Sequence, residues 1–236
     1  MLRGGFVAAA LVALLVVISG CGDSAAESGG DAGENAHIDE QTGSTHELVP
    51  DEREGIPPPA VKVTGLRKTA AQAGCFLRTN LKPKKGKELS PGAPTPKYTT
   101  DPPASGPYVK PPHQQADGAY LNMVDAIDQL GALNHGRMTI QYAPDLPEKI
   151  QLELKGLYDT MYGATLLFPN DEMQFAIAAT TWTNSVGCTS YEDEKTLDAL
   201  RAFGQATWGK FGGEPVEAYP FEGPTPADPA EPEGGK

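Results

Sequence analysis

The sequence predicts an α+β domain with a β-α-β-β-α core, a sandwich of thioredoxin-like or ferredoxin-like type with its helices on one face. Two amphipathic helical stripes alternate with strand-like runs between Met138 and Trp208. The chain has 236 residues, which leaves room for one domain and its tails. The negative charge gathers at the two ends of the chain, so the folded part lies between them.

The core begins with a strand-helix-strand unit. Met138–Tyr142 alternates as a strand does, and Pro144 follows it. Asp145 and Glu148 have the spacing of a helix N-cap with a carboxylate three residues later. The next helix has one apolar face, made of Ile150, Leu154, Leu157, Tyr158 and Met161. Gly163 ends it, and Ala164–Phe168 is a second strand, which a right-handed crossover places parallel to the first.

A hairpin and a second helix complete the core. Pro169–Asp171 turns the chain into a third strand, Gln174–Trp182, which we expect to form an antiparallel hairpin with the second. Ser190–Asp193 caps the last helix, whose apolar stripe is Leu197, Leu200, Phe203 and Trp208. Upstream, Thr69–Cys75 predicts a short helix, and the Pro- and Lys-rich stretch Leu81–Pro112 predicts a loop region.

Charge divides the chain into parts. Residues 22–60 carry ten acids and one base, residues 212–236 carry six acids and one base, and residues 61–211 are near neutral. We therefore expect an acidic flexible tether at 21–60, one folded domain at 61–211 and a disordered Pro/Glu-rich tail at 212–236. A net charge of −12 argues against a nucleic-acid partner, which requires a basic surface.

The N-terminus predicts export and lipidation. Arg3 precedes an unbroken apolar run, Phe6–Ile18, which is too short to span a bilayer and has the length of a signal-peptide core. The run leads into Val17-Ile18-Ser19-Gly20-Cys21, which resembles the lipobox of bacterial lipoproteins. Residues 1–20 are thus predicted to be a lipoprotein signal peptide, and Cys21 the lipidated residue, carrying diacylglycerol and an acyl chain such as palmitate. An ordinary secretory peptide or an uncleaved anchor is the alternative.

The cysteine count agrees with export. The chain has three Cys, and lipidation of Cys21 leaves Cys75 and Cys188. In an oxidising compartment we expect these two to form a disulfide. Two buried free thiols remain the alternative, and there is no CxxC that could form a dithiol redox centre.

Several segments together resemble a known family. Ala70–Cys75, Tyr98–Tyr108, Gly118–Tyr120 and Leu133–Tyr142 followed by Pro144–Pro147 are similar to the domain of unknown function 3105 family, from about Ala70 to Trp208. The members of that family are largely bacterial and many are exported, and their signatures read PPTSGPH and HxLEHG. The resemblance implies no assigned activity. It does imply a polar cluster rich in His, whose HxLEH spacing can present metal ligands and a base on one helical face.

This chain departs from that pattern. Gly131 and Asn134 occupy the positions of the first His and the Glu, Tyr108 that of the His ending PPTSGPH, and Leu89 that of an earlier His. Zinc requires three or four protein ligands, so we expect no metal site; His135 and His113, with Asp117 nearby, are the ligands to test if one exists. Asn134–Gly136 is also explained by turn chemistry before the strand. The candidate functional cluster is Ser105, Tyr108, His113, Tyr120, Asn134 and His135.

Two functions follow as hypotheses. The first is a membrane-anchored, non-catalytic binding or interaction domain on the outer face of the cell membrane, or on the periplasmic side in a two-membrane cell. Its partners would be the membrane, through the lipid, and a cell-envelope protein or polymer, with no cofactor. The second is an extracytoplasmic metal-binding protein or metal-dependent hydrolase with a degenerate His cluster. The loss of family His and Glu residues favours the first.

Overall fold

The computed structural model describes residues 48–60, 65–83, 88–90, 93–109, 117–161 and 163–212. The predicted signal peptide, Cys21 and His113 lie outside the described residues. The described part contains four helices: Leu66–Gln72 (α1), Ala126–Asn134 (α2), Glu148–Asp159 (α3) and Glu194–Thr207 (α4). Among these residues no helix has both the length and the apolar character needed to cross a bilayer.

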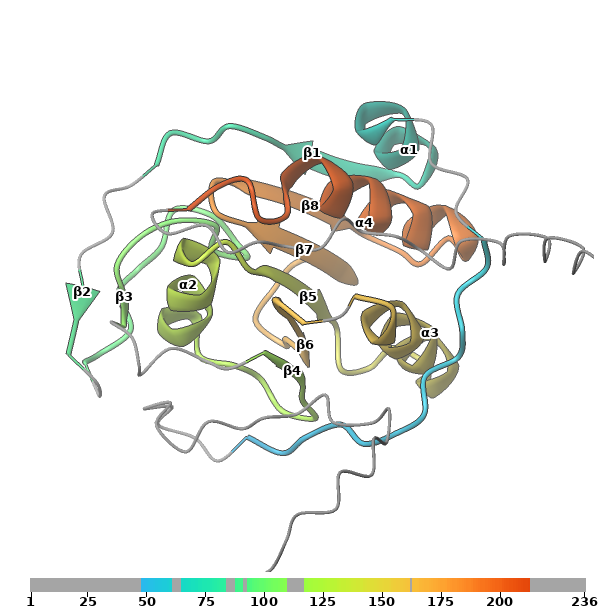
Figure 1. The fold of residues 1–236 in the computed structure, drawn as a ribbon, viewed down its shortest axis with the longest axis horizontal. Helices are drawn as coiled ribbons and strands as arrows, with labels where there is room; N and C mark the ends of the chain where they lie inside the picture. The colour runs from blue at the N-terminus through green and yellow to red at the C-terminus, as the bar shows by residue number, and fades with distance from the viewer. Residues whose placement is uncertain are drawn as a thin grey trace, which may run out of the picture. The chain divides into compact units, whose positions relative to one another are not determined.

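One mixed sheet forms the centre of the domain, with the strand order β1-β8-β7-β5-β6-β4 (Figure 1). Its strands are Cys75–Arg78 (β1), Gly118–Ala119 (β4), Met138–Tyr142 (β5), Thr165–Pro169 (β6), Ile177–Thr181 (β7) and Asn184–Cys188 (β8). β6 runs parallel to β5 and β4, and the other neighbours are antiparallel. A separate parallel pair joins Glu88–Leu89 (β2) to Tyr108–Val109 (β3).

The predicted α+β class is confirmed, including the parallel pair joined by a helix. β5 and β6 pair directly, whereas a ferredoxin-like sheet inserts a strand between its parallel pair, so the thioredoxin-like alternative fits. The predicted hairpin was wrong: β7 pairs with β5 on the side away from β6, and its hairpin partner is β8. The strand predicted at Gln174–Trp182 is shorter, Ile177–Thr181, and a turn with Thr183 at φ 64° leads from it into β8.

The larger core lies on one face of the sheet, under α1, α3 and α4. Alternate residues of each strand point to this face, as Met138, Ile140 and Tyr142 do from β5. Leu154 and Leu157 of α3, with Leu200 and Phe203 of α4, fill the space above them and are fully buried. The predicted apolar stripes of the two helices therefore form this core.

The opposite face is covered by α2, so the expectation that all helices lie on one face was wrong. Ala132 of α2 packs in a second core cluster with Leu166 and Phe168 of β6. Between α2 and β5 lies a buried hydrogen-bond network in which Gln141 Nε2 donates to Gln129 Oε1 at 2.7 Å and to Thr139 Oγ1 at 3.0 Å. The network fixes the position of α2 over the sheet, because each buried amide requires its partner.

Local boundaries also differ from the predictions. The upstream helix α1 begins three residues before the predicted Thr69 and ends at Gln72, and Cys75, predicted as its last residue, already belongs to β1. The N-cap of α3 is Pro147, with no side-chain cap hydrogen bond, so Asp145 does not cap it. The N-cap of α4 is Asp193, the last residue of the predicted capping segment Ser190–Asp193; it has a left-handed φ of 46° and makes no side-chain cap hydrogen bond.

Residues 48–60, which we call the strap, pack against the domain. This part of the predicted flexible tether therefore belongs to the folded part of the chain. The strap pairs with the sheet edge at the Pro50–Tyr120 bridge and passes α3, where the Ile56 N–H donates to the Leu152 carbonyl at 2.8 Å. Figure 1 shows this segment, in blue, running past α3 toward α4. No local sequence pattern indicates this packing, because main-chain hydrogen bonds such as these do not depend on residue type.

The predicted disulfide is confirmed. Cys75 and Cys188 are directly opposite in the β1–β8 ladder and are joined by an S–S bond, with Cα atoms 4.1 Å apart and 113 residues between them in sequence. The bond ties the edge strand β1 to the rest of the sheet. In the chain-entropy account, closing a loop of this length stabilises a domain by about 4–5 kcal/mol.

Candidate functional site

The structure brings together two of the segments on which the family resemblance depends. The loop 102–107 is largely buried, with Ser105 only 7% exposed, and the Ala104 carbonyl accepts a hydrogen bond from the Thr183 N–H at 2.7 Å. Tyr108 then lies edge-on to Trp182, with ring centroids 6.2 Å apart. Both aromatic residues pack around Leu130 and Leu133 of α2. The proline-glycine loop and α2 therefore form one wall of the domain.

Asn134 and His135 lie where α2 ends. His135 is the C-cap residue, and Gly136 at φ 79° turns the chain into β5. The interpretation of this segment as turn chemistry therefore agrees with the structure. The C-terminal end of the domain also packs here: the Gly209 N–H donates to the Gly136 carbonyl at 3.1 Å, and a Cβ at Gly212 would lie 2.4 Å from the Asn134 carbonyl oxygen.

The remaining predicted residues do not join this wall. Tyr120 is 1% exposed and belongs to the second core cluster, with Leu166 and Phe168. Asp117 forms an ion pair with Arg137 at 2.5 Å and accepts a hydrogen bond from the Ala164 N–H at 3.0 Å. Within the described segments no group of three His, Cys, Asp or Glu side chains is arranged to hold a metal ion.

Sequence reasoning missed a buried carboxyl group in this wall. Asp128, in the first turn of α2, is only 2% exposed, and burial together with the nearby Asp125 raises its pKa to about 7. Tyr98 lies close by and donates its hydroxyl to the Pro107 carbonyl at 2.9 Å. Burial and Asp128 raise the pKa of Tyr98. In the sequence, Asp125 and Asp128 resemble ordinary solvated acids at a helix start, so only the fold reveals this burial.

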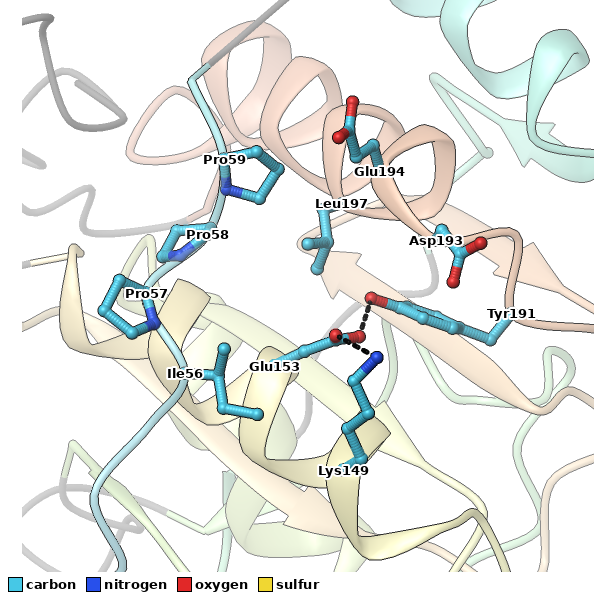
Figure 2. A pocket seen from close by; sticks show the side chains of 10 residues that line it. All are labelled: Ile56, Pro57, Pro58, Pro59, Lys149, Glu153, Tyr191, Asp193, Glu194 and Leu197. Carbon is cyan, nitrogen blue, oxygen red and sulfur yellow. Dashed lines mark hydrogen bonds and ion pairs between the residues drawn. The ribbon is translucent and has the colours of Figure 1, made fainter.

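A groove of about 460 Å³ lies on the opposite side of the sheet, between the strap, α3 and α4 (Figure 2). One wall is the strap segment Ile56–Pro59. Leu197 of α4 lies between the walls. The volume falls within the range of small-molecule sites, and the proline wall needs no further ordering to hold its shape.

Charged side chains line the rest of the groove. Glu153 of α3 accepts the Tyr191 hydroxyl at 2.5 Å and pairs with Lys149 at 3.5 Å, as the dashed lines in Figure 2 show. Burial and the bond to Glu153 raise the pKa of Tyr191, so its hydroxyl stays protonated and donating. Asp193 and Glu194, at the start of α4, complete the rim. Three carboxylates against one ammonium give the groove a negative lining.

The strap wall is held at several points. Arg53 donates to Gln151 Oε1 of α3 at 3.3 Å, and its Nε and Nη2 also donate to the two carboxylate oxygens of Asp51 within the strap, each at 2.8 Å. Burial acts to raise the pKa of Asp51, but the bonds from Arg53 outweigh it and hold that pKa below its ordinary value. At the other end, fully buried Arg201 of α4 donates Nη2 to the Pro59 carbonyl at 2.8 Å. The groove therefore has a fixed wall rather than a loose segment beside it.

The family model described as "Protein of unknown function (DUF3105)" matches residues 93–215, just over half of the chain. The chain belongs to the DUF3105 family. No curated protein and no solved structure gives a match.

The DUF3105 match contains the wall around Tyr108 entirely but the groove only in part. It includes the loop 102–107, α2 and all strands from β4 to β8, so the wall around Tyr108 lies within the family region. The strap, α1 and Cys75 precede the matched range. The groove therefore combines a family part, α3 and α4, with a strap outside that part, and the disulfide joins Cys188 inside the range to Cys75 outside it.

Proposed function

We propose that this DUF3105 protein is a lipid-anchored lipoprotein of the bacterial cell envelope, with a non-catalytic domain that binds a ligand or partner outside the cytoplasm. The observation that carries the proposal is the sequence Val17–Cys21 after a short apolar leader. The Cys75–Cys188 bond supports export, because disulfides persist in oxidising compartments.

Anchoring is tested by replacing the lipidated residue. In a bacterial host, Cys21→Ser should move the chain from the detergent-extracted membrane fraction to the soluble extracytoplasmic fraction and abolish incorporation of a labelled fatty acid. A matched control adds Ser24→Cys to the Cys21→Ser chain: it restores a thiol near the same place without the lipobox spacing, and it should stay soluble. Unchanged membrane association of Cys21→Ser would overturn the lipoprotein proposal.

We place ligand binding in the groove of Figure 2. Its wall of Ile56–Pro59 and its floor at Leu197 offer apolar contact, and the carboxylates around Tyr191 favour a cationic group on the ligand. Such a groove suits a lysine- or amine-bearing segment of an envelope protein or polymer. Partly apolar walls distinguish this surface from a merely acidic one.

A defined probe tests this placement. Trilysine amide, titrated into the Cys21→Ser chain, should shift the amide resonances of Tyr191 and Glu194, and the double variant Asp193→Asn/Glu194→Gln should weaken that binding several-fold. A charge-matched control, Asp171→Asn/Glu172→Gln, removes the same net charge at two exposed residues that do not line the groove and should leave the groove shifts unchanged. Equal losses in both variants would show non-specific attraction and overturn the placement.

A further inference from the structure

Two exposed apolar side chains lie side by side on the described surface. Only three large apolar residues in the described part are strongly exposed, namely Val49 at 49%, Leu121 at 46% and Phe76 at 60%. The Leu121 N–H donates to the Val49 carbonyl at 2.8 Å, beside the antiparallel Pro50–Tyr120 bridge. Isolated exposed leucines need no explanation, but an adjoining pair is a small apolar patch.

The pairing explains why both side chains point outward. In an antiparallel pair, directly opposite residues share a face and successive residues alternate between faces. Tyr120 is 1% exposed and points into the core, so its neighbour Leu121 points out, and Val49 lies opposite Leu121. Half-buried Leu48 and Met123 extend the patch toward the second core cluster.

The backbone of this patch is held in place. The Val49 N–H donates to Asn122 Oδ1 and the Asp51 N–H donates to the Ala119 carbonyl, both at 2.8 Å. Val49 and Leu121 therefore present a fixed surface, and their exposure is not a consequence of a loose chain end.

The patch lies where the chain from the proposed anchor enters the described domain, at Leu48. Cys21 precedes Leu48 by 27 residues. A coil of that length has a root-mean-square end-to-end distance of roughly 30 Å. An anchor at Cys21 would hold the domain next to the bilayer at high effective concentration. The face with Val49 and Leu121 would be nearest to the anchor along the chain.

We propose that Val49 and Leu121 contact the lipid bilayer that holds the anchor, inserting at the boundary between headgroups and acyl chains. The inference rests on the proposed lipidation of Cys21. Residues 48–51 and 118–123 contain no Lys or Arg, so the contact is apolar and should not weaken when salt is raised. Anchor and patch together would orient the domain on the membrane.

The test uses full-length lipidated protein in phosphatidylcholine vesicles that contain brominated lipid, which quenches nearby tryptophan. Leu121→Trp and, separately, Val49→Trp place the reporter in the patch, and Phe76→Trp is the matched control at another exposed apolar position. The natural Trp182 and Trp208 are buried and give the background, measured in the unsubstituted protein. We expect at least about two-fold stronger quenching of the added tryptophan at 121 and 49 than at 76, unchanged by salt.

The outcomes separate the two proposals. If the unsubstituted protein fails to remain with the vesicles, anchoring is wrong and the inference fails with it. If it remains bound but quenching at positions 121 and 49 does not exceed that at 76, only the membrane contact is overturned. A concentration-dependent dimer of the Cys21→Ser chain that Leu121→Ser abolishes would show that a second copy covers the patch, and would also overturn it.

Discussion

Gly156→Ala tests whether the strap packs on α3 as described. A Cβ at position 156 would lie 1.8 Å from the Ile56 carbonyl oxygen and 2.4 Å from its carbon, closer than real Cβ contacts, which stay above 3.0 Å. Gly55 faces the same point, since its own Cβ would lie 2.3 Å from the Gly156 nitrogen. The variant must therefore push the strap backbone away by more than about 1 Å or displace it.

The sign of the effect is decided by two opposing contributions. Alanine within a helix is more stable than glycine by about 0.5–1 kcal/mol, so without the strap Gly156→Ala would stabilise α3. Overpacking a close contact costs about 1–3 kcal/mol, and displacing the strap also breaks the Ile56 N–H bond to Leu152. If Pro59 moves, buried Arg201 loses a charged hydrogen bond worth about 1.5–3 kcal/mol. We expect a net destabilisation of about 2 kcal/mol, a fall in Tm of roughly 4–8 °C.

Urea and thermal unfolding of the Cys21→Ser chain measure the change, and amide hydrogen exchange at Ile56 reports the strap directly. Trypsin should also cleave after Arg53 faster in the variant, because in the native protein the Arg53 side chain is bonded to Gln151 of α3. Lys149→Ala, at an exposed site on the same helix, is the control for a generic alanine effect and should change Tm little. A more stable Gly156→Ala protein with unchanged exchange at Ile56 would refute the packing of the strap.

Three further predictions concern the disulfide, a buried acid and a histidine. Alkylation without reduction should label neither Cys75 nor Cys188, and reduction should lower the unfolding free energy by about 2–5 kcal/mol; quantitative labelling of both would contradict the bond. Burial raises the native pKa of Asp128 to about 7, above its unfolded value of about 3.9, so the native state binds more protons and stability falls as pH rises from about 4 to 7. Asp128→Asn should flatten that slope in pH-dependent unfolding, and an unchanged slope would contradict the assignment. His135→Ala should shift Tm only slightly and purified protein should hold far less than one zinc per chain; near-stoichiometric zinc that the variant loses would favour the metalloprotein hypothesis.

The sequence predicted those parts of the fold in which apolar periodicity is strong. β5 was predicted with its observed bounds because Met138–Tyr142 alternates and a proline follows. α3 and α4 were predicted because their stripes repeat over three turns or more, and both helices bury those stripes. The cysteine pair followed from export chemistry rather than from any local pattern.

Elements without such patterns escaped prediction. β8 has the sequence Asn-Ser-Val-Gly-Cys, with one large apolar residue, and its turn uses Thr183 at positive φ instead of an Asn-Gly signal. α2 contains Gly131 and buries polar Gln129 within a network, so its amphipathic pattern is weak. The groove could not be predicted because its lining residues range from Ile56 to Leu197 and no single segment of the sequence contains a recognisable motif for it.

The strap connects the apolar patch to the groove. The segment begins at Leu48 beside the patch, crosses α3 at the Gly55–Gly156 contact and ends at Pro59, on the buried guanidinium of Arg201. A ligand that moved the Ile56–Pro59 wall would have to break those same contacts. If ligand binding in the groove changed the affinity of Val49 and Leu121 for the membrane, membrane contact would change the affinity for the ligand by the same factor. Gly156→Ala disturbs the strap at Ile56, in the groove wall, and leaves the patch residues Val49 and Leu121 unchanged. If they are coupled, this variant should change both the trilysine shifts at Tyr191 and the lipid quenching of a tryptophan at position 121. A change in the groove alone would show that the Pro50–Tyr120 bridge holds the patch independently.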